Sequence, residues 1–280
     1  MVKGTVSSRP PETEPRVRRG YFESRHGQLH VHNAIPPGGG FEEGTPLLCL
    51  HKSPLSGRLF ERFLALAGRD RSVYAPDIPG FGESDPPASR PTLVDYAAAI
   101  GDFLDTMRFR QIDLLGYHAG SLVAAELAIM RPKQVRRVVL ISVPVLTESE
   151  REGVKRSYSA TQPAIDGSHL ASEWQRTADT YGRGAPLELV TQSFVEKLRN
   201  GVHPAWLTHA ALQYPVRERL SLITQQILLM RPRDDLWDAT LRARELLPKA
   251  RCIDLQEQGQ GLFEAAPELV ADGIREFLRG

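Results

Sequence analysis

The feature that most constrains this chain is Gly116-Tyr117-His118-Ala119-Gly120, a Gly-x-His-x-Gly segment. It follows the apolar run of residues 112–115, which is typical of a buried strand, and a helical stretch begins near Ser121. A central side chain at this spacing sits on a sharp strand-to-helix turn, where flanking glycines let the two backbones approach closely. The spacing therefore predicts a strand, a strained turn that presents His118, and a helix.

Strand-like and helix-like segments alternate along the rest of the chain. Strand-like runs cover residues 46–50, 72–76, 138–141, 226–230 and 253–255, and helical patterns cover residues 59–66, 92–107, 241–247 and 267–278. This alternation favours an α/β fold, with a mostly parallel twisted sheet and helices on both of its faces. Residues 20–34 alternate polar and apolar side chains, which predicts an antiparallel pair of strands at one edge.

Residues 146–221 break this rhythm because they are polar, favour helix and contain no strand-like run. We therefore expect an α/β core of residues 20–145 and 222–280, interrupted by an inserted helical cap over residues 146–221. Residues 1–19 are expected to form a flexible lead. Aromatic residues of the cap, such as Trp174 and Trp206, suggest a small, partly apolar organic substrate, although such residues more often hold cap helices together.

Charge and composition exclude several classes of function. The formal net charge is +1, which leaves no electrostatic footprint for nucleic acid or an anionic membrane. No apolar run reaches the roughly 20 residues of a spanning helix, and residues 1–20 lack the apolar stretch of a secretory signal. Cys49 and Cys252 lie in strand-like runs, where buried thiols are expected. We expect a cytoplasmic protein that acts on a small molecule, without nucleic-acid or membrane partners, and leave homodimerisation open.

No pattern in the sequence predicts a metal or a cofactor. Neither a phosphate-cradling loop nor a dinucleotide fingerprint is present. His30 and His32 share one face of a predicted edge strand, but no third ligand follows at a useful spacing. Surface positions are therefore expected for both histidines, and the site is expected to work without a cofactor or a metal.

Several ordered segments resemble those of the α/β-hydrolase fold family, over roughly residues 20–280. They are Leu50-His51-Lys52-Ser53-Pro54, the Asp-x-Pro-Gly-x-Gly-x-Ser segment of residues 77–84, the turn at His118, the Gly-x-x-Asp-like turn of residues 232–235, and the Gly-His-x-x-x-Glu-x-Pro-like segment of residues 259–267. The resemblance implies a hydrolase whose triad acid is Asp235, with Asp234 as the rival acid. It also implies oxyanion-hole amides at Ser53 and Ala119.

The chain departs from the family at the residues that carry the chemistry. Histidine occupies position 118, where the family has its nucleophilic serine, and Gln260 occupies the place of the histidine base. A glutamine amide cannot accept a proton near neutral pH, so the serine-hydrolase mechanism is unavailable. Lys52 also replaces a glycine, and could either stabilise an enolate or carboxylate or be a solvated loop lysine. Ser121 is expected to cap a helix rather than to replace the nucleophile.

We expect His118 to be the working base. Its long ring points towards the space that the family's late histidine fills, where Asp235 could hold one nitrogen and leave the other facing the pocket. This His–Asp dyad could activate water for attack on an ester-like bond, with Lys52, Tyr117 and Gln260 beside the substrate.

Two alternatives to hydrolysis remain open at this stage. The dyad could instead take a proton from a substrate carbon or hydroxyl, in a cofactor-free lyase, isomerase or dioxygenase. Alternatively, the chain could bind a ligand without catalysis, as an inactive pseudo-hydrolase.

Overall fold

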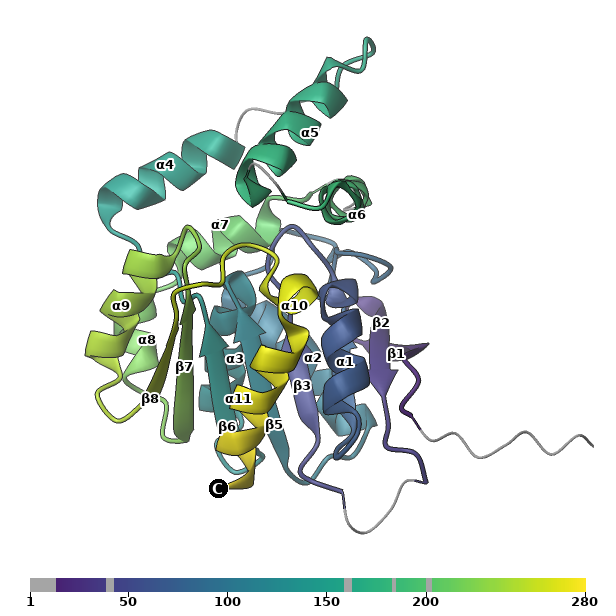
Figure 1. Cartoon of the computed structure of the whole chain (residues 1–280), viewed down its shortest axis with the longest axis vertical. Coiled ribbons are helices and arrows are strands. Elements are labelled where there is room, and N and C mark those ends of the chain that lie inside the picture. The colour runs from purple at the N-terminus through teal and green to yellow at the C-terminus, as the bar shows by residue number, and fades with distance from the viewer. Residues whose placement is uncertain (1–13, 39–42, 159–162, 183–184, 200–202) are drawn as a thin grey trace, which may run out of the picture.

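The chain folds around one eight-stranded sheet with strand order β1-β2-β4-β3-β5-β6-β7-β8 (Figure 1). This is seen in a computed structural model that describes residues 14–38, 43–158, 163–182, 185–199 and 203–280. The strands are β1 (Arg18–Ser24), β2 (Gly27–Ala34), β3 (Leu47–Leu50), β4 (Val73–Pro76), β5 (Ile112–Tyr117), β6 (Val135–Ile141), β7 (Gln226–Pro232) and β8 (Arg251–Leu255). β2 pairs antiparallel with both β1 and β4, and all other neighbouring strands pair parallel, which confirms the predicted α/β fold.

The predicted boundary between the N-terminal lead and the core lies within the first strand. Residues 1–13 of the predicted lead lie outside the described residues, and β1 begins at Arg18, two positions before the predicted start of the core. β1 pairs only with β2, and β2 also pairs with β4. The antiparallel pair therefore lies at an edge of the sheet as predicted, with β1 as the edge strand.

Helices cover both faces of the sheet (Figure 1). α1 (Glu61–Ala67), α10 (Leu262–Ala265) and α11 (Pro267–Arg279) pack together on one face, and α2 (Leu93–Thr106) and α3 (Ala119–Met130) pack together on the other. Successive residues of a strand point to opposite faces, so Leu48 and Leu50 join one core cluster while Leu47 and Cys49 join the other. Because both faces are covered, the central strands are mostly apolar, and the buried Asp113 of β5 is paired with Arg136 of β6.

α2 begins where the sequence supplies a capping box. Thr92 accepts a hydrogen bond from the Asp95 amide at 3.3 Å, and the Asp95 carboxylate accepts one from the Thr92 amide at 2.8 Å. These two bonds satisfy amide groups that have no partner within the first turn of a helix. The predicted helix over residues 92–107 is thus observed as Leu93–Thr106.

Within the described residues, the chain between β6 and β7 forms helices and no strand. They are α4 (Glu148–Tyr158), α5 (Ser168–Tyr181), α6 (Leu187–Leu198), α7 (Trp206–Gln213) and α8 (Val216–Leu220), followed after β7 by α9 (Trp237–Leu246). α4, α5 and α6 lie beyond one end of the sheet, and α7 lies between them and the core (Figure 1). Glu126 of α3 anchors this region because its buried carboxylate accepts hydrogen bonds from Tyr214 at 2.6 Å and Arg219 at 2.5 Å. The helices occupy the segment for which a cap is predicted.

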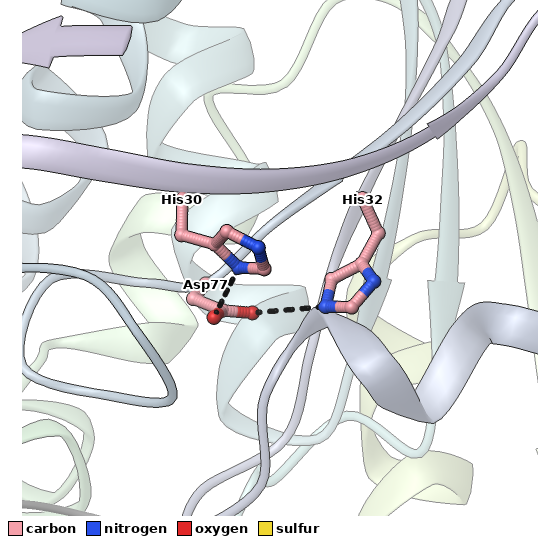
Figure 2. A group of neighbouring side chains, drawn as sticks. All are labelled: His30, His32 and Asp77. Carbon is pink, nitrogen blue, oxygen red and sulfur yellow. Dashed lines mark hydrogen bonds and ion pairs between the residues drawn. The ribbon is translucent and has the colours of Figure 1, made fainter. Parts of the chain in front are cut away.

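The structure corrects the expectation that His30 and His32 lie at the surface. Both rings are buried, because β2 has β1 on one side and β4 on the other. Figure 2 shows both rings turned towards Asp77, with His30 Nδ1 2.8 Å from Asp77 Oδ2 and His32 Nε2 3.9 Å from Asp77 Oδ1. A third polar group therefore does face the pair, although it comes from a distant part of the sequence.

Asp77 is already engaged in holding loops of the core. Its carboxylate accepts hydrogen bonds from the Gly57 amide at 2.7 Å and the Glu83 amide at 2.9 Å, in addition to the one from His30. Burial lowers the pKa of His32 to about 4, so this ring is neutral near neutral pH. We interpret the three side chains as a structural cluster that fastens β2 to the loops after β3 and β4.

Candidate active site

His118 lies on the turn between β5 and α3, as the glycine spacing predicts. Its backbone has φ 53° and ψ −122°, a conformation that residues with a Cβ rarely adopt. A Cβ on Gly116 would lie 2.4 Å from the carbonyl oxygen of Gly120, and a Cβ on Gly120 would lie 2.2 Å from that of Leu50. The two glycines are therefore required by backbone contact, and they fix the position from which the imidazole projects.

The His118 ring is held by Asp234. His118 Nε2 lies 3.1 Å from Asp234 Oδ2, and the Asp234 side chain is fully buried. The same carboxylate accepts hydrogen bonds from Ser142 Oγ at 2.6 Å and from the Leu236 amide at 2.9 Å. The hydrogen bond predicted between His118 and Asp235 is thus made by the neighbouring residue, because the turn after β7 directs the Asp234 side chain inwards.

The pKa of Asp234 reflects these contacts. Burial alone would raise it, but the hydrogen bond and charge of His118, together with the hydrogen bonds from Ser142 and Leu236, outweigh burial and lower it. Asp234 is therefore ionised around neutral pH, as a partner of an imidazole must be.

Asp235 is exposed and contacts Gln260. The nearest approach of its carboxylate to His118 Nε2 is 3.8 Å, and Oδ1 accepts a hydrogen bond of 2.6 Å from Gln260 Nε2. The other end of the Gln260 amide, Oε1, accepts a hydrogen bond of 2.9 Å from Lys52 Nζ. Lys52, Gln260 and Asp235 therefore form one continuous row beside His118.

Tyr117 contacts both His118 and Lys52. Tyr117 is fully buried, and its ring meets that of His118 edge to face at 4.6 Å between centroids. Lys52 Nζ lies 5.2 Å from the centroid of the Tyr117 ring, within the range of a cation–π contact. The structure thus excludes the interpretation of Lys52 as a solvated loop residue.

The two amides predicted to form an oxyanion hole are both free to donate. Among the described residues, neither the Ser53 nor the Ala119 amide donates a hydrogen bond. The Ser53 side chain accepts one from Thr208 of α7 at 3.1 Å, which links this turn to the helices between β6 and β7. Ser121 Oγ donates to the His118 carbonyl at 2.5 Å within the first turn of α3, whose N-cap residue is His118 and has no side-chain capping bond, so the expected capping role of Ser121 is not observed.

A cavity of about 740 Å³ lies between the site and helices α4 to α6. Of the residues predicted for the site, only Asp235 lines it, next to Pro54 and Leu236. Arg176 and Lys197 also line it, and both ion-pair with Glu173. The cavity wall thus combines apolar and charged groups.

The two tryptophans of the region pack against other rings. Trp174 packs edge to face against Phe194, with 5.4 Å between ring centroids. Trp206 stacks on His203 at 3.8 Å. Neither tryptophan lines the cavity, and the Trp174–Phe194 contact joins α5 to α6, as expected for an aromatic residue that holds cap helices together.

Sequence reasoning missed Ser142. This residue directly follows the apolar strand β6, has φ 54°, and donates to Asp234. A polar residue at the carboxyl end of the strand next to β5 is the pattern that could have identified it, because ligand sites in open parallel sheets form at that edge.

No helix among the described residues is long and apolar enough to cross a membrane.

Comparisons with known proteins show similarity to α/β-hydrolases. The sequence profile of the family described as alpha/beta hydrolase fold matches residues 45–181. A 2-hydroxymuconate semialdehyde hydrolase from Pseudomonas sp. (strain CF600) is 38% identical over 108 residues, which are 35% of this chain and 36% of that protein. A proline iminopeptidase from Heyndrickxia coagulans is 24% identical over 194 residues, 67% of this chain and 64% of that protein. The matches thus span 36% and 64% of these relatives' lengths.

Solved structures share the whole architecture. A hydrolase from Pseudomonas aeruginosa PA01 superposes with a TM-score of 0.78 at 19% identity, over 94% of this chain and 99% of that one. At this level of identity the likeness concerns the fold.

Proposed function

Because this chain has the fold of the α/β-hydrolase family, we propose that it hydrolyses an ester-like bond in a small, partly apolar organic molecule, with His118 as general base. The observation that carries the proposal is the 3.1 Å contact between His118 Nε2 and the buried carboxylate of Asp234. The names of the relatives, a semialdehyde hydrolase and an iminopeptidase, support a hydrolytic reaction class.

The tautomer of His118 follows from its partner. An ionised carboxylate only accepts hydrogen bonds, so Nε2 carries the ring proton and Nδ1 carries the lone pair. Nδ1 takes a proton from a water molecule whose oxygen attacks the carbonyl carbon of the substrate. The ring then returns that proton to the leaving group, while Asp234 stabilises the transient imidazolium. General acid–base catalysis of this kind contributes about 10² to 10⁴ in rate.

The backbone supplies the other half of the mechanism. The amides of Ser53 and Ala119 are assigned to the oxyanion that forms when water adds, and both are without another acceptor among the described residues. No side chain of the chain needs to become covalently attached to the substrate in this scheme. A cavity of about 740 Å³ next to Asp235 would accommodate a small organic molecule.

The test measures aryl-ester hydrolysis and active-site labelling on the same protein. Wild type should hydrolyse members of an aryl-acetate panel, and His118→Ala should lose that activity while the matched variant His203→Ala, at an exposed position, retains it. A fluorophosphonate probe should leave the wild type unlabelled, because the mechanism has no serine nucleophile. Labelling that disappears in His118→Ala would contradict the scheme.

A second variant separates a base from a nucleophile at position 118. His118→Ser places the family's nucleophile on the turn, but Gln260 still cannot accept its proton. This variant should therefore remain inactive towards the same esters. Substantial activity in His118→Ser would show that another group in the site is the base.

A further inference from the structure

Lys52 is a buried amine at the centre of the site for which the hydrolytic scheme has no use. It follows β3, is 9% exposed, and reaches Gln260 Oε1 at 2.9 Å. Within the part of the chain that the structure describes, no carboxylate lies within ion-pair distance of Nζ. Its two contacts are a neutral amide oxygen and the face of the Tyr117 ring.

The amide oxygen of Gln260 and the ring of Tyr117 carry no negative charge that would neutralise a Lys52 ammonium group. Burial lowers the pKa of Lys52. The more distant carboxylates of Glu264, Asp235 and Asp234 act in the opposite direction, and Lys197 acts in the same direction as burial. A buried lysine with this balance holds a larger fraction of neutral amine near neutral pH than an exposed lysine does, and a neutral amine is a nucleophile.

Lys52 belongs to the same hydrogen-bonded row as a residue of the cavity wall. The Gln260 amide bridges Lys52 Nζ and the Asp235 carboxylate, and Asp235, though not Lys52 itself, lines the large cavity. Beside Lys52, the buried atoms Tyr117 Oη and Glu264 Oε2 have no hydrogen-bond partner within the described residues. Buried polar atoms without a partner are rare in native structures, and a catalytic role or a bound water is the usual explanation for them.

We propose that Lys52 is a second reactive group of this site, which forms an imine with the carbonyl carbon of a small aldehyde or ketone. The nitrogen lone pair adds to the carbonyl carbon, and one nitrogen proton moves to the oxygen to give a carbinolamine. The hydroxyl group then leaves as water after it accepts a proton, and the remaining nitrogen proton is released as the C=N double bond forms. Condensation therefore releases one water molecule and needs no oxidant or reductant.

Glu264 is suited to supply the proton for the departing water. Burial raises the pKa of Glu264, against the opposing effect of the Lys52 charge, so this carboxyl group keeps its proton to a higher pH than an exposed glutamate does. An imine draws electrons from the adjacent carbon, which would make the site competent for bond changes next to a carbonyl. This activity goes beyond ester hydrolysis and does not depend on it.

The experiment traps the imine on the native full-length chain. Wild type is incubated at pH 7 with benzaldehyde and sodium cyanoborohydride, which reduces an imine to a stable secondary amine, and the adducts are mapped by peptide mass spectrometry. Lys133 and Lys249 are exposed and serve as internal references. We expect Lys52 to carry several-fold more adduct than either reference, and this preference should vanish when the same reaction is run on the chain unfolded in urea.

Variants distinguish this result from general lysine labelling. Lys52→Arg should remove the selective adduct, and the matched Lys249→Arg should keep it. His118→Ala should also keep it, because the amine does not need that ring, so failure of the hydrolytic scheme would leave this result intact. An adduct at Lys52 that does not exceed those at Lys133 and Lys249 in the folded protein overturns the proposal.

Discussion

His118 Nε2 lies 3.1 Å from Oδ2 of Asp234, whose side chain is fully buried, and 3.8 Å from Oδ1 of Asp235, whose side chain is 68% exposed. Two adjacent carboxylates thus face one imidazole from different environments. The buried one is fixed by Ser142 and the Leu236 amide, whereas the exposed one contacts Gln260 and the cavity. Differences of environment are what assign different roles to chemically identical groups.

The first prediction separates the two carboxylates. Asp234→Asn removes the charge that fixes the His118 tautomer and stabilises the imidazolium, so kcat/KM for an aryl ester should fall by about 10²-fold or more. The matched variant Asp235→Asn keeps the His118 contact to Asp234 and should lose much less. Steady-state kinetics on both purified variants measure the two losses in kcat/KM. A larger loss in Asp235→Asn would show that Asp235, and not Asp234, supports His118.

The second prediction concerns Ser142. Ser142→Ala removes a 2.6 Å hydrogen bond to the buried Asp234 carboxylate, and should lower the free energy of unfolding by about 1–3 kcal/mol. Asp234 has a depressed pKa in the folded state, so its contribution to stability is present above its unfolded pKa and is lost as the pH falls through the folded pKa. Without Ser142 the pKa of Asp234 in the folded state rises. Urea titrations at a series of pH values should therefore show the free energy of unfolding starting to fall at a higher pH than in wild type. An unchanged onset would mean that Ser142 does not hold the carboxylate.

The third prediction concerns the anchor of α7 and α8 on the core. Glu126→Gln leaves Arg219 and Tyr214 facing a neutral group in a buried setting, and should cost about 3 kcal/mol in urea denaturation. Glu152→Gln is the matched control, because Glu152 forms an exposed pair with Lys155 within α4. The control should leave the midpoint unchanged within error. Equal midpoints for the two variants would show that the Glu126 contacts do not anchor the helices.

The fourth prediction concerns His32. Its folded pKa of about 4 lies below the unfolded value of about 6.5, so protonation favours the unfolded chain. Stability from this residue is complete above pH 6.5 and declines as the pH falls towards 4, by about 3 kcal/mol in total. His32→Phe keeps a planar ring without a titrating group. Its free energy of unfolding should therefore depend less steeply on pH between 6.5 and 4, and a slope equal to that of wild type would be inconsistent with a buried neutral ring.

Local patterns in the sequence were sufficient to predict the fold and the turn at His118. The turn at that point requires glycine at 116 and 120, because a Cβ at either would collide with a carbonyl oxygen. The alternation of apolar strands and amphipathic helices similarly determined the mostly parallel sheet. These features depend on spacing along the chain, which a single sequence displays.

Features that depend on contacts between distant segments could not be predicted in the same way. Asp234 and Asp235 are neighbours in sequence, and the choice between them depends on Ser142, which lies 92 residues away in the chain. The burial of His30 and His32 depends on strand neighbours and on Asp77, which lies 47 residues after His30. Neither relationship leaves a periodic pattern that could be recognised beforehand.

The most direct test of the central claim is an NMR measurement of the His118 ring. Long-range ¹H–¹⁵N correlation at neutral pH reports which nitrogen carries the proton, and the His118→Ala spectrum assigns the signals. A His118–Asp234 pair predicts a protonated Nε2 and an unprotonated Nδ1, with that preference lost in Asp234→Asn. A proton on Nδ1 in wild type, or a spectrum that Asp234→Asn leaves unchanged, would contradict it.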